Sequence, residues 1–161
     1  MKAMLERSSQ YLTFHLAGQD YGIEIAQVRE IRAWERPTRL PHAPDYVEGV
    51  IHVRGKVLPI LDLRRRFGLG DANRPPVSVV VVVQSDATRA ASSAGLVVDA
   101  VSDVCEINAA TIQAPPQVVA GIDAELVCGL CSSGERLLVL LAIERLIHRA
   151  AASAPDASAA A

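Results

Sequence analysis

Five consecutive valines, Val79–Val83, constrain the local structure of this chain more than any other feature. β-branched side chains are stiff at χ1 and favour extended backbone. A stretch that is apolar at every position is typical of a strand buried on both faces or of a barrel wall. No stretch approaches the ~18 apolar residues that a membrane-spanning helix needs. The valines therefore predict a buried β-strand, and the chain as a whole predicts no membrane insertion.

Other short apolar stretches, each bounded by turn residues, repeat this style along the chain. Tyr11–Leu16 alternates apolar and polar side chains, and with Tyr21–Ile25 it predicts a hairpin. Val50–Val53 and Lys56–Leu61 predict a second hairpin, because Arg54-Gly55 between them suits a tight reversal. About ten strands of this kind and almost no long helix predict an all-β sandwich or barrel.

The two ends of the chain differ from its middle. Ile143–Arg149 predicts a short C-terminal helix with its apolar residues on one face. Residues 1–9 are expected to form a flexible lead. Residues 150–161 are low-complexity Ala and Ser with little to bury, which predicts a disordered tail. The ordered domain is expected to cover residues 10–149.

Charge and cysteine content narrow the function classes. The 161 residues carry 16 basic and 18 acidic side chains and only 4% aromatics. Nucleic-acid binding needs a positive footprint and favours stacking aromatics, so no nucleic-acid partner is expected. Three cysteines do not suit a disulfide-stapled secreted fold, and the N-terminus has no apolar leader. A cytoplasmic location is predicted.

A CxxC motif, Cys128 to Cys131, is the sharpest candidate for chemistry. Such a pair can bind zinc or cycle between thiol and disulfide. The chain has no second CxxC and no HxxxH, and two cysteines at this spacing in a strand would face opposite sides. Two small buried or half-buried thiols are the expected outcome, with a redox or zinc protein as the alternative.

The remaining polar features give no catalytic constellation. Carboxylate pairs such as Glu24 with Glu30 have no adjacent nucleophile or base. Arg64–Arg66 is interpreted as a solvated face or an interface patch. Trp34 suits an interface anchor and a half-buried connector equally well. No enzymatic activity, metal or cofactor is predicted.

Seven stretches together resemble a known family, and they are Tyr21–Ile25, Val28–Ile31, Thr38–Pro41, Gly49–Gly55, Val57–Arg64, Gly95–Val104 and Leu137–Leu141. In this order and spacing they resemble the CheW family of chemotaxis coupling proteins. Each stretch alone is common, but the ordered set is specific and covers about residues 10–149.

The resemblance implies two small five-stranded SH3-like β-barrels packed together, with short helical turns and a short C-terminal helix. It implies an adaptor without enzymatic activity. The implied partners are the cytoplasmic tip of a methyl-accepting chemoreceptor and the regulatory domain of a CheA-type histidine kinase. Such an adaptor would be recruited to receptor arrays at the inner membrane. An adaptor of a different array, controlling twitching motility or gene expression, is the same-class alternative.

The resemblance also suggests a binding surface. Glu30 and Arg54 match family positions associated with partner binding, and the expected surface is completed by Val28, Ile31, Gly55, Val98, Asp99 and Val101. Asp99 is expected to cap a turn or pair with a basic group, with apolar area exposed beside it at Val98 and Val101. His52 and Ala142 depart from the usual family residues, which bears on partner choice more than on fold.

Overall fold

The computed structural model describes residues 8–71, 74–85, 92–115, 118–119 and 122–147. Short strands dominate these residues. They are β1 (Ser8–Leu16), β2 (Gln19–Glu24), β3 (Val28–Ala33), β4 (Val47–Val53), β5 (Lys56–Asp62), β6 (Val79–Ser85), β7 (Ser92–Val98), β8 (Ala100–Asn108), β9 (Val118–Val119), β10 (Ile122–Asp123), β11 (Val127–Ser133) and β12 (Arg136–Leu141). The helical pieces are η1 (Ile25–Gln27), α2 (Leu63–Arg66), η2 (Ala109–Thr111), η3 (Ala124–Leu126) and the C-terminal helix at residues 143–147.

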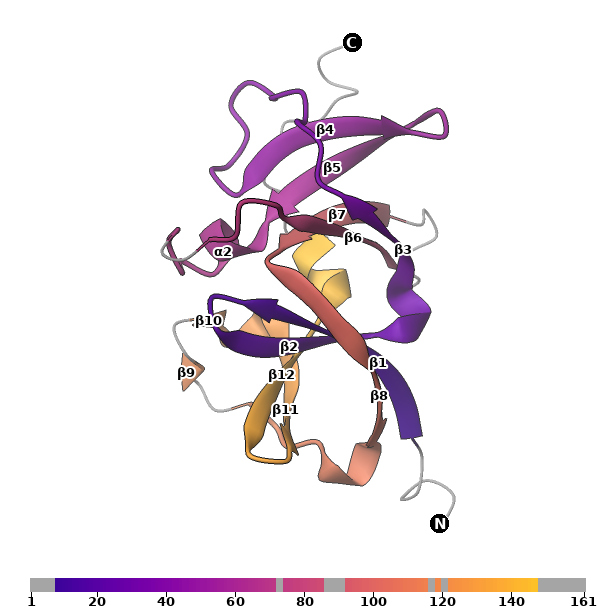
Figure 1. The fold of residues 1–161 in the computed structure, drawn as a ribbon, viewed down its shortest axis with the longest axis vertical. Helices are drawn as coiled ribbons and strands as arrows, with labels where there is room; N and C mark the ends of the chain where they lie inside the picture. Colours follow the sequence, from indigo (N-terminus) through magenta and orange to yellow (C-terminus); the bar gives the residue numbers. More distant parts are fainter. Residues whose placement is uncertain (1–7, 72–73, 86–91, 116–117, 120–121, 148–161) are drawn as a thin grey trace.

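The strands form two five-stranded β-barrels that are stacked along the long axis of the molecule (Figure 1). Barrel 1 has the strand order β11-β12-β2-β1-β8, and barrel 2 has the order β3-β6-β7-β5-β4. The predicted all-β, twin-barrel fold is confirmed. No helix of the described residues is long and apolar enough to cross a membrane.

The two barrels exchange strands. β3 follows β2 along the chain but pairs with β6 in barrel 2, and β8 follows β7 but pairs with β1 in barrel 1. Each barrel therefore combines a hairpin from one half of the chain with three strands from the other half. Neither half of the chain can complete a barrel alone, so the two barrels form one folding unit.

The exchange relates the barrels by an internal structural repeat. Each barrel contains one parallel pair, β12 with β2 in barrel 1 and β5 with β7 in barrel 2. A glycine lies in each pair, Gly22 opposite Leu140 and Gly95 opposite Ile60. The register shift after Val47 in β4 recurs at the matching place in β11. No exact repeat is visible in the sequence, because the two halves share pairing geometry rather than residues.

Apolar side chains form three clusters. One lies inside barrel 2, around Ile60 and Val80, and one lies inside barrel 1, around Tyr11 and Leu138. The third and largest is a seam between the barrels, which is built from the outward faces of both hairpins and is closed by α2 and the C-terminal helix (Figure 1). Strand alternation explains the division, since successive residues of β6 point into barrel 2 and into the seam.

The described chain ends agree with the predictions at the C-terminal helix but not at the start of the first strand. The apolar face of the C-terminal helix, formed by Ile143, Leu146 and Ile147, is buried in the seam as expected. β1 begins at Ser8, three residues before the predicted start at Tyr11, because Ser8 and Ser9 pair with β8, so the predicted flexible lead of residues 1–9 is wrong for these two residues. Residues 1–7 and the predicted tail lie outside the described residues.

Candidate functional site

Glu30 and Arg54, the two residues singled out by the family resemblance, form an ion pair. Arg54 Nη2 lies 3.0 Å from Glu30 Oε2, and Arg32 Nη1 donates to Glu30 Oε1 at 3.1 Å. The hydrogen bond from Arg32 is the main reason that the pKa of Glu30 is lowered; desolvation opposes it, and the charges of Arg54 and Arg32 add to the lowering. Glu30 is therefore an ionised carboxylate held between two guanidinium groups.

Turn chemistry places Arg54 at this position. Val53 pairs with Lys56, so Arg54 and Gly55 form a two-residue hairpin turn, and both have positive φ, 53° and 80°. That conformation belongs to a type I′ turn, which matches the twist of the strands on either side. β3 and β4 are the two edge strands of their sheet. The ion pair therefore links Glu30 on one edge strand to Arg54 at the end of the other, and it borders the open end of barrel 2.

A hollow of about 340 Å³ lies at this end of barrel 2, and we call it the barrel 2 mouth. Its lining combines the ion pair with apolar and basic side chains: Arg29, Glu30, Val53, Arg54, Lys56, Val57, Leu58, Val82, Gln84 and Ser93. Val57 is 58% exposed, although it belongs to an otherwise apolar strand. An exposed valine beside a charged pair is suited to contact with another protein.

Val28 and Val101 occupy equivalent places in the two barrels. Val28 pairs with Val83, Val101 pairs with Phe14, and both valines pack partly buried against the seam cluster. The next outward apolar residues, Ile31 and Val104, are also equivalent. Ile31 pairs with Val81, two residues from the partner of Val28, and Val104 pairs with Leu12, two residues from the partner of Val101.

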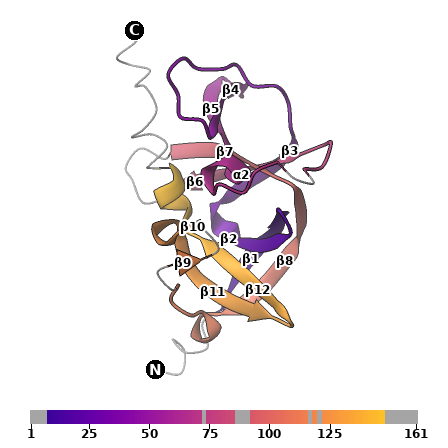
Figure 2. The ribbon, with the colours of Figure 1, turned by 90° about the vertical axis from the view of Figure 1, so that its left-hand side faces the viewer.

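Ile31 is 48% exposed and Val104 is 47% exposed. β3 and β8 lie on the same side of the molecule in both views, one in each barrel (Figures 1 and 2). We call the four residues Val28, Ile31, Val101 and Val104 the seam strip. It is an apolar, pseudo-symmetric surface that crosses from one barrel to the other.

Val98 does not belong to any surface. It is 1% exposed and packs in the seam cluster, so the expectation that it offers apolar area to a partner is wrong. The reason is strand alternation, since Val98 ends β7 on the face that Ala94 and Leu96 also bury in the seam.

Asp99 is occupied within the fold, and the prediction that it pairs with a basic group is confirmed. It accepts from Arg64 Nε at 2.8 Å and from the backbone N–H of Ala17 at 2.9 Å. Burial raises the pKa of Asp99, but the bonds from Arg64 and Ala17 outweigh it, so its pKa is lowered overall. Asp99 thus links α2 of one barrel to the hairpin turn of the other.

The interpretation of Arg64–Arg66 as a solvated face is wrong for Arg64, which is only 1% exposed. The short helix α2 turns Arg64 inward, where it also donates to the Gly70 carbonyl at 3.2 Å. Arg65 does reach the surface, since its side chain is 53% exposed, and Arg66 is half-buried. Periodicity within a single helical turn gave no means of telling which arginine would face the seam.

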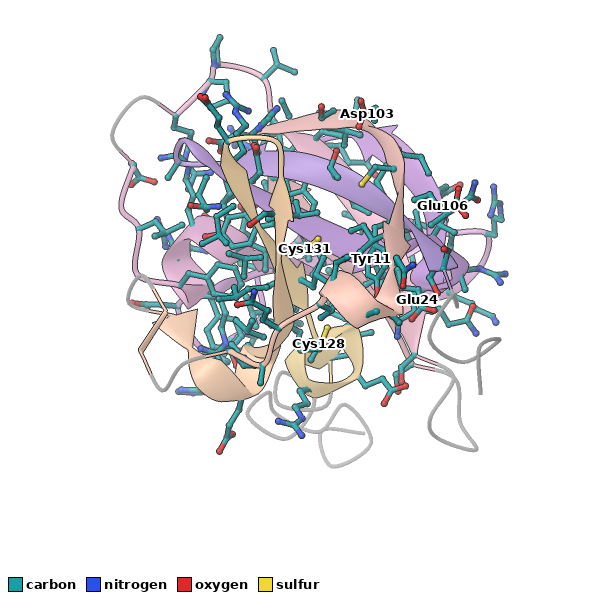
Figure 3. The ribbon with its side chains drawn as sticks, turned by 90° about the horizontal axis from the view of Figure 1, so that it is seen from below. Tyr11, Glu24, Asp103, Glu106, Cys128 and Cys131 are labelled. Carbon is teal, nitrogen blue, oxygen red and sulfur yellow. The ribbon has the colours of Figure 1, made fainter. Side chains whose placement is uncertain are left out.

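Cys128 and Cys131 both lie within β11, which excludes a disulfide between them in this fold. Three residues along a strand span about 10 Å, whereas the Cα atoms of a disulfide lie within about 7 Å of each other. Cys131 is buried beside Tyr11 in barrel 1 (Figure 3), and Cys128 Sγ contacts the Leu141 carbonyl at 3.6 Å. Cys128 is exposed, so the expectation of two buried or half-buried thiols is wrong for Cys128 and holds for Cys131. Partial desolvation of its sulfur nevertheless raises the pKa of the Cys128 thiol. In the described part of the chain no three His, Cys, Asp or Glu residues gather to hold a metal.

Trp34 borders a second hollow, of about 580 Å³, at the other end of barrel 2. It is 39% exposed, and its Nε1 donates to Glu48 Oε1 at 3.0 Å. Both interpretations of this residue therefore remain compatible with its position. Sequence reasoning missed Val57, which is identified by its exposure at the barrel 2 mouth, and Val104, which is identified by its equivalence to Ile31.

The comparisons with known proteins agree with this architecture. The CheW-like domain family matches residues 10–151. The chain is 36% identical over 138 residues to a chemotaxis protein CheW of Klebsiella aerogenes, covering 86% of this chain and 81% of that one. It is 33% identical over 146 residues to a probable chemotaxis protein CheW of Rhizobium etli, covering 91% and 92%. The crystal structure of the scaffolding protein TtCheW from Thermoanaerobacter tengcongensis superposes with a TM-score of 0.76 and 31% identity, covering 85% of this chain and 86% of that chain.

Proposed function

Because this chain belongs to the CheW-like family of chemotaxis scaffold proteins, we propose that it is a cytoplasmic adaptor that couples chemoreceptors to a CheA-type histidine kinase. In this role it does no chemistry itself. The single observation that carries the proposal is that β3 contributes to two exposed surfaces, to the seam strip through Val28 and Ile31 and to the barrel 2 mouth through Glu30.

The seam strip supports the receptor side of the proposal. A coiled-coil tip presents helices with apolar residues at i, i+3, i+4 and i+7, and such helices dock into apolar surfaces. Exposed Ile31 and Val104, with Val28 and Val101 between them, offer contacts from both barrels to one helix. A receptor seated there would contact both barrels at once and so sense their shared seam.

The barrel 2 mouth supports the kinase side. It carries the Glu30–Arg54 pair, which provides directional charged contacts, and the apolar area of Val57. Charged groups at the rim of an apolar patch give specificity and a regulated affinity rather than great strength. Receptor state would then bias kinase activity through contacts that differ between two states of the complex.

Pull-down of the purified chain with a kinase regulatory domain and with a receptor cytoplasmic fragment tests both halves. Glu30→Arg is expected to reduce kinase binding at least tenfold, and Ile31→Asp with Val104→Asp to reduce receptor binding by a similar factor. Val77→Asp is the matched control, since Val77 is 71% exposed and belongs to neither surface. Undiminished binding of both partners by the surface variants, with unchanged thermal unfolding, would reject the assignment.

A further inference from the structure

The seam strip is symmetric in shape but not in charge, and we infer that charge fixes the direction in which a helical partner lies across it. The acidic end of the partner helix lies over β3 and its basic end over β8. This inference rests on the proposed docking of a helix on the seam strip and adds the partner's charge pattern and orientation.

Apolar contacts alone cannot set this direction. Val28 is equivalent to Val101 and Ile31 to Val104, with nearly equal exposure in the outer pair. Turning a helix end for end about the pseudo-two-fold axis would bury the same kinds of side chain. The free energies of the two orientations would therefore be nearly equal on hydrophobic grounds.

The charged residues on the two strands are different. β3 carries exposed Arg29, which also borders the barrel 2 mouth, and its equivalent on β8 is Ser102. β8 carries exposed Glu106, and its equivalent on β3 is Ala33. Neither Arg29 nor Glu106 makes an ion pair with any residue that the structure describes. Figure 3 shows Glu106 and Asp103 on the same strand of barrel 1.

The whole barrels are polarised in the same sense. Residues 28–98, which supply every strand of barrel 2, contain eleven basic and seven acidic side chains. Residues 8–27 and 99–147, which supply barrel 1, contain two basic and nine acidic side chains. The net charges are +4 and −7, so a ligand that spans the seam passes from a positive to a negative field.

The occupant that fits is an amphipathic helix with one apolar stripe, acidic residues at one end and basic residues at the other. Val28 and Ile31 pair with residues two apart on β6, and Val101 and Val104 pair with residues two apart on β1, because each segment contains a bulge. Each pair therefore spans about 7 Å of strand. A helix of eighteen residues is about 27 Å long, which is sufficient to reach both arms of the strip. Its opposite-charge contacts fall on exposed residues, so they select orientation more than they add affinity.

The test uses two synthetic eighteen-residue peptides with the same leucine stripe and an N-terminal nitroxide. One has Glu in its first third and Lys in its last third, and the other has the reverse. Bound to isotope-labelled full-length protein at low salt, the Glu-first peptide is expected to broaden amide signals of β3, and the Lys-first peptide those of β8. A peptide with Gln at all charged positions is expected to broaden both strands equally.

The double variant Arg29→Glu with Glu106→Lys is expected to shift the strand preference of both peptides toward the opposite strand. Equal broadening of β3 and β8 by both charged peptides, with shifts at the seam strip, would overturn the inference and leave the proposed function standing. No shifts at Ile31 or Val104 with any peptide would instead reject the docking site and the proposed function with it. Broadening that depends on protein concentration without peptide would assign the strip to a second copy of the chain, which also overturns the inference.

Discussion

The guanidinium of Arg64 and the carboxylate of Asp99 meet at the seam, where Nε of Arg64 donates to Oδ1 of Asp99 at 2.8 Å. Arg64 is almost fully buried, and Asp99 also accepts the backbone N–H of Ala17 from the other barrel. A buried ion pair of this kind contributes little compared with an apolar replacement, but removing one partner leaves an uncompensated charge. The pair is therefore a sensitive point of the fold.

Asp99→Asn is expected to lower the free energy of unfolding by about 3 kcal/mol, because the charge of Arg64 stays buried without a counter-ion. Urea denaturation at pH 7 measures the loss. Glu35→Gln is the control: Glu35 lies 3.7 Å from Arg32, its side chain is 55% exposed, and the change is expected to cost no more than about 0.5 kcal/mol. Equal effects of the two substitutions would contradict the structural role of Asp99.

Because of the Asp99 carboxylate, we expect the free energy of unfolding to fall as the pH is lowered into the acid range. The pKa of Asp99 is lowered in the fold below its ordinary value of 3.8. Its contribution is thus fully present above pH 3.8 and is lost as the pH falls toward the folded-state pKa. The difference in unfolding free energy between the native chain and Asp99→Asn should be constant from pH 7 to 5 and shrink below pH 4. A difference that grows in acid would have the wrong sign.

Gly22 is required by close packing inside barrel 1. A Cβ at this position would lie 2.9 Å from Leu140 Cδ2, so Gly22→Ala is expected to cost about 1–3 kcal/mol of unfolding free energy. In a Leu140→Ala background the obstacle is gone, and the cost should fall by at least about 1 kcal/mol. A Leu96→Ala background is the control, since Leu96 packs in the seam and leaves the obstacle in place.

Arg54→Ala should separate binding from stability. The Arg54 side chain is 80% exposed, so loss of its ion pair with Glu30 is expected to change the free energy of unfolding by less than about 1 kcal/mol. Kinase binding, measured by calorimetry, should weaken at least tenfold, and the loss should be smaller in high salt because charged contacts are screened. Normal binding together with a large drop in melting temperature would show that Arg54 serves the fold instead.

Cys128 is expected to be a slow nucleophile. Although Cys128 is exposed, partial desolvation of its sulfur raises the pKa of its thiol above the ordinary 9.0, which lowers the thiolate fraction near neutral pH. Iodoacetamide at pH 8 should modify Cys128 more slowly than free cysteine, as followed by mass spectrometry. Faster modification would point to an activated thiol and revive the redox alternative for the CxxC motif.

The local elements of this protein, and its family, could be predicted from the amino-acid sequence. Alternation in Tyr11–Leu16, the valines of β6 and the Arg54-Gly55 turn each predict their own conformation, because side-chain period and φ preference act within a few residues. The apolar face of the C-terminal helix was readable for the same reason. The ordered set of stretches identified the twin-barrel family, and with it Glu30 and Arg54 as residues of interest.

The pairing of the strands, and therefore which residues meet, could not be predicted from the sequence and depends on the folded arrangement of the chain. The side-chain alternation in β3 and β8 indicates which face of each strand is buried. It does not indicate which strand each one pairs with, because backbone N–H and C=O groups are alike at every position. The strand exchange between barrels follows from that choice. It brings Asp99 to Arg64, turns Val98 inward and makes Ile31 equivalent to Val104. Contacts of this range depend on how the two halves bury their apolar faces against each other, which no local pattern encodes.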